Sequence, residues 1–246
     1  MSRARVAAIA LLAATASSCS SSFGMPSGAS EQGQDIFNLW QVFFWAAIVV
    51  AAVVYGLLGW SLLRYRRRRA EPDALGRQFR EHIPLEIVYT AIPVVIVIGL
   101  FAASISTGDT VGDVTPNPDV VLHAEAFSWG WRFSFPNEGV IVLSDPSGEG
   151  VPGPVVKLPV GETVRVELTS NDVIHAFWVP EFLFKRDAIP GRTNIFDVTP
   201  TTPGTYHGVC SEYCGLNHAY MTFTVEVVPA QEFRSWLTQQ PSESTA

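Results

Sequence analysis

The stretch Cys210-Ser-Glu-Tyr-Cys214-Gly-Leu-Asn-His218-Ala-Tyr-Met221 carries more information about this chain than any other segment. It contains two thiols, an imidazole and a thioether, although the whole chain has only three cysteines in 246 residues. Soft sulfur donors next to an imidazole are ligand types that suit copper. Copper held in this way can carry one electron at a time, so the stretch predicts an electron-transfer protein.

Cys210 and Cys214 could also form a disulfide, belong to a structural zinc site or bind a single copper. Two nearby thiols in an oxidising compartment often form a disulfide, but a disulfide does not require His218 and Met221 at these spacings. Structural zinc sites use Cys and His rather than Met. A mononuclear blue-copper site needs one Cys, two His and a weak axial Met. The additional thiol therefore favours two coppers bridged by two thiolates.

A dinuclear site of this kind needs a second imidazole from elsewhere in the chain. We expect it to be His175, in the segment Asn-Asp-Val-Ile-His-Ala-Phe-Trp, just past an expected strand at 163–168. His123 and His207 are the alternatives. His207 ranks second because it lies three residues before Cys210 on an expected strand.

Two apolar blocks near the N-terminus predict membrane spans. The first, Ile36 to Leu63, contains no charged residue, which is far more typical of a span than of a soluble core helix. The second, Ile83 to Ile105, contains Glu86 and two prolines but has a similar length. The Arg-rich stretch between them, 64–82, carries a net charge of +4. Flanked by two spans, it predicts a cytoplasmic loop rather than a nucleic-acid site.

An earlier apolar run, Val6 to Ala16, is too short to span a bilayer and follows Arg3 and Arg5. A basic start, an apolar core and small residues before Cys19 predict a secretory signal peptide over 1–18. Cys19 resembles the lipid-modified cysteine of bacterial lipoproteins, and the alternative is an incidental cysteine removed with the leader. Residues 19–35 would then form an extracytoplasmic N-terminal segment.

The remainder of the chain has the pattern of an external β domain. Residues 107–119 are rich in Gly, Asp, Pro and Thr and predict a linker. Short apolar or alternating runs between turns then predict an antiparallel sandwich or barrel. The expected strands are 120–126, 131–135, 140–143, 163–168, 176–179, 194–198, 205–209 and 222–228. A short helix is expected at 230–237, followed by a flexible tail at 239–246. Residues 107–246 carry a net charge of −10, which favours a basic partner or simply solubility.

Cys-x-Glu-x-Cys-x3-His-x2-Met, preceded by two spans, resembles the pattern of cytochrome c oxidase subunit II and its dinuclear copper centre, CuA. The resemblance extends over nearly the whole mature chain. It implies a two-helix transmembrane hairpin over 36–106. It also implies an all-β, cupredoxin-like Greek-key barrel or sandwich over 120–238.

The resemblance implies six copper ligands: His175, Cys210, the backbone carbonyl of Glu212, Cys214, His218 and Met221. The two thiolates would bridge two coppers, and each imidazole would bind one of them. The thioether would be a weak ligand of one copper, and the carbonyl would bind the other. The Glu212 side chain would contribute to a magnesium site shared with subunit I.

Two further segments resemble the family. Ala126-Phe-Ser-Trp129-Gly-Trp131 is similar to the aromatic segment whose first Trp receives the electron from cytochrome c, although the commoner pattern is His-Gln-Trp-Tyr-Trp. This implies that role for Trp129. Leu85-Glu86-Ile-Val-Tyr-Thr-Ala-Ile-Pro93 is similar to the second-span signature and implies that Glu86 lies at the mouth of a proton-uptake channel. An ionisable residue in a span is a functional candidate by default, with snorkelling as the alternative.

The resemblance implies a bacterial cell-membrane protein with its C-terminal domain on the extracytoplasmic side. It would assemble with subunit I, which holds haem and copper, and with subunit III. It would pass electrons from a c-type cytochrome to haem, for oxygen reduction coupled to proton translocation.

Three other functions remain as alternatives. A copper-free quinol oxidase subunit II would lack the ligands that are present here. A copper-binding assembly protein would not need the Glu86 and Trp129 segments. Nitrous-oxide reductase carries a large additional domain.

Overall fold

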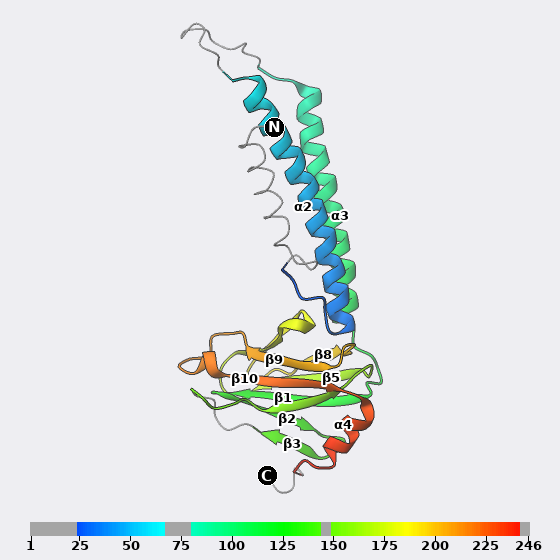
Figure 1. Ribbon diagram of the computed structural model, residues 1–246, viewed down its shortest axis with the longest axis vertical. Coiled ribbons are helices and arrows are strands. Elements are labelled where there is room, and N and C mark those ends of the chain that lie inside the picture. The colour runs from blue at the N-terminus through cyan, green and yellow to red at the C-terminus, as the bar shows by residue number, and fades with distance from the viewer. Residues whose placement is uncertain (1–23, 67–79, 144–148, 242–246) are drawn as a thin grey trace, which may run out of the picture. The chain divides into compact units, whose positions relative to one another are not determined.

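The computed structural model describes residues 24–66, 80–143 and 149–241. The described residues separate into two compact units: a helical unit that lies between 38 and 109, and a unit that combines the described residues before 38 with those from 110 onward. Figure 1 shows the helices and strands that make up each unit. The signal peptide, Cys19, most of the Arg-rich loop and the end of the tail, which were predicted from the sequence, lie outside the described residues.

Two long helices confirm the predicted spans. Helix α2 covers Glu31–Arg64 and helix α3 covers Ile83–Gly112. Both are long and apolar enough to cross a membrane, and Pro93 is accommodated inside α3. Helix α3 continues seven residues beyond its predicted end at Ile105. The predicted linker is therefore shorter, because Gly108 and Asp109 do not interrupt the helix.

The β domain contains two five-stranded sheets. The first sheet has the order β3-β2-β1-β5-β8, with β1 Val120–Phe127, β2 Gly130–Phe135, β3 Val140–Leu143, β5 Val164–Ser170 and β8 Asn194–Val198. The second has the order β4-β10-β9-β6-β7, with β4 Val155–Pro159, β6 His175–Val179, β7 Phe184–Ala188, β9 Gly204–Cys210 and β10 Thr222–Val228. Short 3-10 turns η1 and η2 cover Pro180–Phe182 and His218–Tyr220, and helix α4 covers Ala230–Leu237. This confirms the fold class of two apolar helices followed by a cupredoxin-like all-β domain.

The prediction of a purely antiparallel domain is wrong at two places. Strand β1 pairs in parallel with β5, and β4 pairs in parallel with β10. The chain leaves the first sheet after β3, forms β4 in the other sheet and returns as β5 beside β1. The alternation of apolar residues reports which face of a strand is buried but not the direction of its neighbour.

Two strands were missed in the sequence. Strand β4 ends at Pro159, and β7 reads Phe-Lys-Arg-Asp-Ala. Both lie at the edges of the second sheet. Charges and prolines are common in edge strands because they discourage pairing with another chain. These residues therefore weaken the strand signal at the positions where they protect the sheet.

The core lies between the two sheets. Strands β1, β5 and β10 bury every second side chain. Aromatic rings from both sheets meet at the centre, where Phe177 stacks on Phe223 with ring centroids 4.7 Å apart and Trp131 contacts Phe223 at 5.2 Å. Helix α4 covers one end of the core through Phe233, whose ring lies 5.6 Å from that of Phe135. This packing holds the ends of β6, β9 and β10 that carry the candidate site.

The segments leading into and out of the helical unit are attached to the β domain. The backbone N–H of Ala29 donates to the carbonyl of Glu181 at 2.7 Å, and the carbonyl of Ala29 accepts from Thr201 at 2.9 Å. On the other connection, the backbone N–H of Thr115 donates to the carboxylate of Asp197 at 2.7 Å, and Asp197 is paired with Arg165. Both connections are thus fixed by hydrogen bonds to this domain.

Candidate metal centre

The Cys-rich loop joins two neighbouring strands of the second sheet. Cys210 is the last residue of β9, and Met221 directly precedes β10, with which β9 pairs. The turn after Cys214 needs Gly215, whose φ of +116° is unfavourable for other residues. A short, folded loop between paired strands gives its side chains fixed positions.

The two thiols face each other without forming a bond. Their Sγ atoms lie 3.8 Å apart, and both cysteines are free and buried. A disulfide requires a sulfur–sulfur distance of about 2.05 Å. The disulfide alternative therefore does not describe this structure.

Each thiol has an imidazole of its own. Nδ1 of His175 lies 3.8 Å from Sγ of Cys210, and Nδ1 of His218 lies 3.5 Å from Sγ of Cys214. The ligand atoms of His175, Cys210 and Cys214 all lie within 4.8 Å of one another, and all three residues are buried. The arrangement is a pair of sulfurs with one imidazole beside each of them.

Two weaker donors complete the cluster. Sδ of Met221, which is fully buried, lies 3.8 Å from Sγ of Cys214. The backbone carbonyl oxygen of Glu212 lies 3.3 Å from Sγ of Cys210. The structure thus brings together all six groups that the family resemblance implies as copper ligands. Two thiols, two imidazoles, a thioether and a carbonyl form a donor set that fits copper.

The sheet order explains why His175 and not another histidine reaches the thiols. Strand β6 pairs with β9, with Phe177 opposite Cys210, and this places His175 at the same end of the sheet as the loop. His207 lies on β9 opposite Thr224 and is exposed. The imidazole that neighbours Cys210 therefore comes from a residue distant in sequence.

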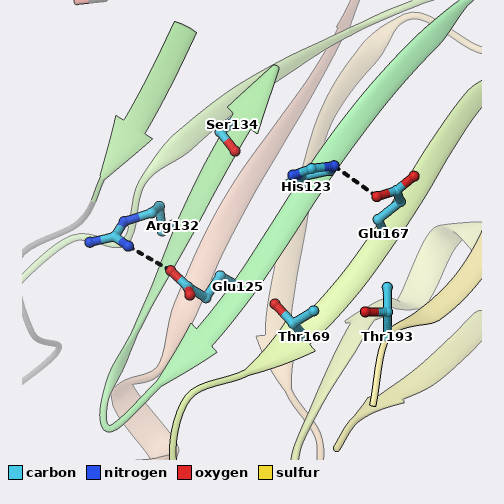
Figure 2. Close-up of a pocket in the computed structure, with 7 residues that line it drawn as sticks. All are labelled: His123, Glu125, Arg132, Ser134, Glu167, Thr169 and Thr193. Atoms are coloured by element: carbon cyan, nitrogen blue, oxygen red, sulfur yellow. Dashed lines mark hydrogen bonds and ion pairs between the residues drawn. The ribbon is translucent and has the colours of Figure 1, made fainter. Parts of the chain in front are cut away.

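His123 lies in a different environment, on the solvent face of the first sheet. It lines a cavity of about 300 Å³ together with other polar side chains, most of them from neighbouring strands. Figure 2 shows these side chains. Its Nε2 lies 2.7 Å from Glu167, and Arg132 pairs with Glu125 at the same distance. His123 thus contacts a carboxylate of the first sheet rather than the two thiols.

The two thiols differ in acidity. Burial opposes ionisation of Cys210, but hydrogen bonds with His175, with the backbone around Ala176 and Glu212, and with His218 together outweigh burial and lower the pKa of this thiol to about 7. Burial and the adjacent Cys210 raise the pKa of Cys214 to about 12. One thiolate thus forms readily and opposes the second. A bound cation would remove this repulsion, because metal binding displaces the thiol protons.

The outer side of His175 contacts a carboxylate that the sequence did not single out. Nε2 of His175 lies 2.8 Å from Oδ1 of Asp172. Burial alone would raise the pKa of Asp172, but hydrogen bonds from Ser128 and His175 outweigh it and hold the pKa well below its usual range. Burial lowers the pKa of His175, and its contacts with Cys210 and Asp172 more than compensate and raise it. In the sequence, this contact was indicated by a carboxylate three residues before a candidate His ligand.

Trp129 lies against the Cys-rich loop. Its indole Nε1–H donates to the backbone carbonyl of Cys214 at 3.0 Å. The ring also covers Gly215, where a Cβ atom would come within 3.1 Å of the indole. The tryptophan singled out in the sequence is therefore joined to the loop by a direct hydrogen bond.

The two glutamates for which the sequence analysis predicted functions lie in different surroundings. The carboxylate of Glu212 is exposed to solvent and pairs with Lys185 at 3.1 Å. Glu86 belongs to the helical unit, in the first turn of α3, where its carboxylate accepts a hydrogen bond from the backbone N–H of His82 at 3.0 Å. Thr90 lies one turn further on the same face, among apolar side chains.

Comparisons with known proteins agree over both parts of the chain. The family model of the cytochrome c oxidase subunit II transmembrane domain matches residues 18–106, and that of the periplasmic domain matches residues 151–228. The Streptomyces coelicolor protein named probable cytochrome c oxidase subunit 2 is 36% identical, covering 92% of this chain and 83% of the relative. Cytochrome c oxidase subunit 2 of Mycobacterium bovis is 30% identical, covering 96% of this chain and 81% of the relative.

A solved structure is also similar. The periplasmic domain of subunit II of cytochrome oxidase from Bradyrhizobium japonicum is 34% identical, with a TM-score of 0.46, covering 52% of this chain and 96% of that domain. The family models and the two bacterial relatives establish that this chain belongs to the cytochrome c oxidase subunit II family.

Proposed function

We propose that this chain binds two copper ions in the cluster of Cys210, Cys214 and their neighbours, accepts electrons there from a c-type cytochrome, and passes them to haem in subunit I. The observation that carries the proposal is the unbridged pair of sulfurs 3.8 Å apart, each with its own imidazole. A mononuclear blue-copper site has a single thiolate. Two buried thiols between two imidazoles match a dinuclear site instead.

The protein's part in this function is to hold the donors in fixed positions. Copper supplies one-electron redox chemistry when it is bound. His175 on β6 and the loop between β9 and β10 are held by the aromatic core, so the donors need little rearrangement when charge changes. Met221 would be a weak ligand on one side and the carbonyl of Glu212 on the other. Burial of the thiols keeps water from the sulfurs.

Trp129 is proposed as the residue that receives the electron from the cytochrome. Its hydrogen bond to the carbonyl of Cys214 gives a short covalent and hydrogen-bonded route from the indole to a bridging thiol. We assign a second role to the Glu212 carboxylate, as part of a magnesium site shared with subunit I. The exposure of this carboxylate at the surface of the β domain supports this assignment.

The helical unit has its own proposed function. Glu86, at the start of α3, would lie at the mouth of a proton-uptake channel that continues into subunit I. The Arg-rich loop would face the cytoplasm under the positive-inside rule, and the β domain would lie on the extracytoplasmic side. Removal of a leader over 1–18, lipidation of Cys19 and assembly with subunits I and III belong to the same proposal.

The proposal is tested on the full chain in the purified oxidase complex. We expect two copper ions per chain beyond the copper of subunit I, a near-infrared absorption band, and oxidation of a reduced c-type cytochrome. A Cys210→Ser variant should lose the band and the cytochrome activity. A complex that lacks this copper and oxidises quinol instead would overturn the proposal.

A further inference from the structure

Asp172 lies in the loop between β5 and β6, three residues before His175. A carboxylate can only accept hydrogen bonds, so the 2.8 Å contact with His175 is a donation from the imidazole Nε2–H to Oδ1. This contact fixes the tautomer of His175. In the neutral imidazole, the lone pair is then on Nδ1, which faces Cys210, and this is the state in which an imidazole binds a metal.

The other oxygen of Asp172 contacts a different part of the chain. Oδ2 accepts a hydrogen bond from the backbone N–H of Ser128 at 2.6 Å. Ser128 lies in the turn between β1 and β2, directly before Trp129. A single side chain therefore joins the candidate ligand His175 to the turn that carries the tryptophan.

The contacts form a closed ring. From Trp129 the ring passes through the indole hydrogen bond to Cys214, then through the two thiols to His175. It returns through Asp172 to the N–H of Ser128, which is bonded to Trp129. The turn is thus held at both ends of the cluster, on the Cys214 side and on the His175 side.

We propose that Asp172 is a positioning residue that fixes the His175 imidazole and the Ser128–Trp129 turn in one arrangement. It would thereby set both the reduction potential of the metal centre and the rate at which an electron reaches it through Trp129. The inference rests on the proposed copper function and goes beyond it, because it makes two properties depend on one carboxylate that binds no metal.

The loop itself supports a positioning role. Oδ1 of Asp172 also accepts from the backbone N–H of Val173 at 2.7 Å, and Ser170 Oγ donates to the carbonyl of Val173. These hydrogen bonds lie within the loop that carries Asp172 and help to fix the position of its carboxylate. His175 is fully buried, whereas the Asp172 side chain is 35% exposed. The carboxylate thus bridges the buried ligand and the protein surface where a donor would approach.

The substitution Asp172→Asn changes the hydrogen bonds of this side chain but keeps its volume, so it tests positioning separately from packing. An amide oxygen can accept from one of the two partners, but the NH₂ group then faces the other N–H donor. Either the Nε2–H of His175 or the N–H of Ser128 loses its acceptor, while the side-chain volume is kept. Asp172→Ala removes both contacts. Glu138→Gln, in the exposed turn between β2 and β3, is the matched control because it removes one negative charge elsewhere in the same domain.

The experiment uses the full chain in the assembled oxidase, in wild-type and variant forms. Four quantities are measured: copper content, the reduction potential of the centre, the nitrogen hyperfine couplings of its histidines, and the rate of electron uptake from reduced cytochrome c. Loss of a carboxylate beside a ligating histidine typically weakens metal binding or activity by about 10- to 100-fold. We expect Asp172→Asn to raise the potential, since a negative charge next to the oxidised centre is removed. It should also change one histidine coupling and slow electron uptake about 10-fold, with Glu138→Gln unchanged.

The outcomes separate this inference from the proposed function. If the wild-type complex holds no copper at this site, the proposed function fails. If the wild type holds copper but Asp172→Asn keeps its potential, couplings and uptake rate, the positioning role is overturned even if thermal stability falls. Should Asp172→Ala fail to assemble, Asp172→Asn alone decides, because it preserves the side-chain size.

Discussion

The indole Nε1–H of Trp129 donates a hydrogen bond to the backbone carbonyl of Cys214 at 3.0 Å, and the ring covers Gly215. The tryptophan comes from the turn between β1 and β2 in the first sheet, and the cysteine from the loop of the second sheet. The hydrogen bond therefore connects the two sheets at the candidate metal centre.

Replacing this tryptophan should separate electron uptake from copper binding. Trp129→Phe removes the indole N–H but keeps an aromatic ring, so we expect loss of the hydrogen bond to lower stability by about 1 kcal/mol. Electron uptake should slow at least 10-fold, with an unchanged copper spectrum, as followed by stopped-flow mixing with reduced cytochrome c. Trp236→Phe, in α4, is the control. Equal rates in both variants would place electron uptake elsewhere.

The two candidate histidines are distinguished by paired substitutions. His175→Ala removes the buried imidazole beside Cys210 and should abolish dinuclear copper binding. His207→Ala changes an exposed side chain on β9 and should leave copper content as in the wild type. Metal analysis of the purified complexes checks both. The reverse pattern would reassign the ligand.

Met221 is expected to influence the reduction potential of the copper centre more than the retention of copper. Met221→Leu keeps the apolar volume of a fully buried side chain, so the free energy of unfolding should fall by less than about 1.5 kcal/mol. Removing the sulfur should shift the reduction potential while most of the copper stays bound. Redox titration of the near-infrared band measures this, and an unshifted midpoint would exclude Met221 as a ligand.

The pair Arg165–Asp197 should contribute to the stability of the β domain. The Asp197 side chain is 4% exposed and also accepts a hydrogen bond from Thr115. Arg165→Met leaves a buried carboxylate without its cation, which costs about 3–5 kcal/mol. Denaturant unfolding of the full chain in detergent should show this loss.

Two further variants test whether burial makes the Arg165–Asp197 pair important for stability. Arg132→Met breaks the more exposed pair with Glu125 and should cost less than about 1 kcal/mol. The double variant Arg165→Met/Asp197→Asn should recover part of the lost stability, because the buried charge is gone. A double variant less stable than Arg165→Met would show that Asp197 acts through its hydrogen bonds alone.

The charge of the β domain predicts that association with a basic cytochrome depends on salt. Residues 107–246 carry a net charge of −10. Exposed charges are screened beyond about 8 Å at physiological ionic strength, so added salt should slow association with a basic cytochrome. The second-order rate constant from stopped-flow measurements should fall steadily between low and physiological salt. A rate independent of salt would show that docking does not use this charge.

Much of the fold could be predicted from local patterns. The absence of charge from Ile36 to Leu63 predicted a span, and α2 contains this whole segment. The strands at 140–143, 194–198 and 222–228 and the helix at 230–237 have the bounds that were predicted. Such features depend on residues close in sequence, which decide whether a segment is apolar throughout, alternating or turn-forming.

The candidate site also has one part that local sequence predicts and another that depends on the packing of distant strands. The spacing of Cys210, Cys214, His218 and Met221 within one short loop already determined that four donors would lie together. Three histidines could have supplied the second imidazole, and only the pairing of β6 with β9 brought His175 to the thiols. The bridge from Asp172 to the Trp129 turn likewise joins segments 44 residues apart.

Local sequence patterns therefore predicted the spans, most of the strands and the donor types of the loop. The parallel pairing of β1 with β5, the edge strands β4 and β7, and the contacts of His175 and Asp172 follow only from the packing of the domain. Periodicity and spacing fix local conformation and the buried face. Which distant segments meet depends on how two sheets share one core, and that is settled only when the whole domain packs.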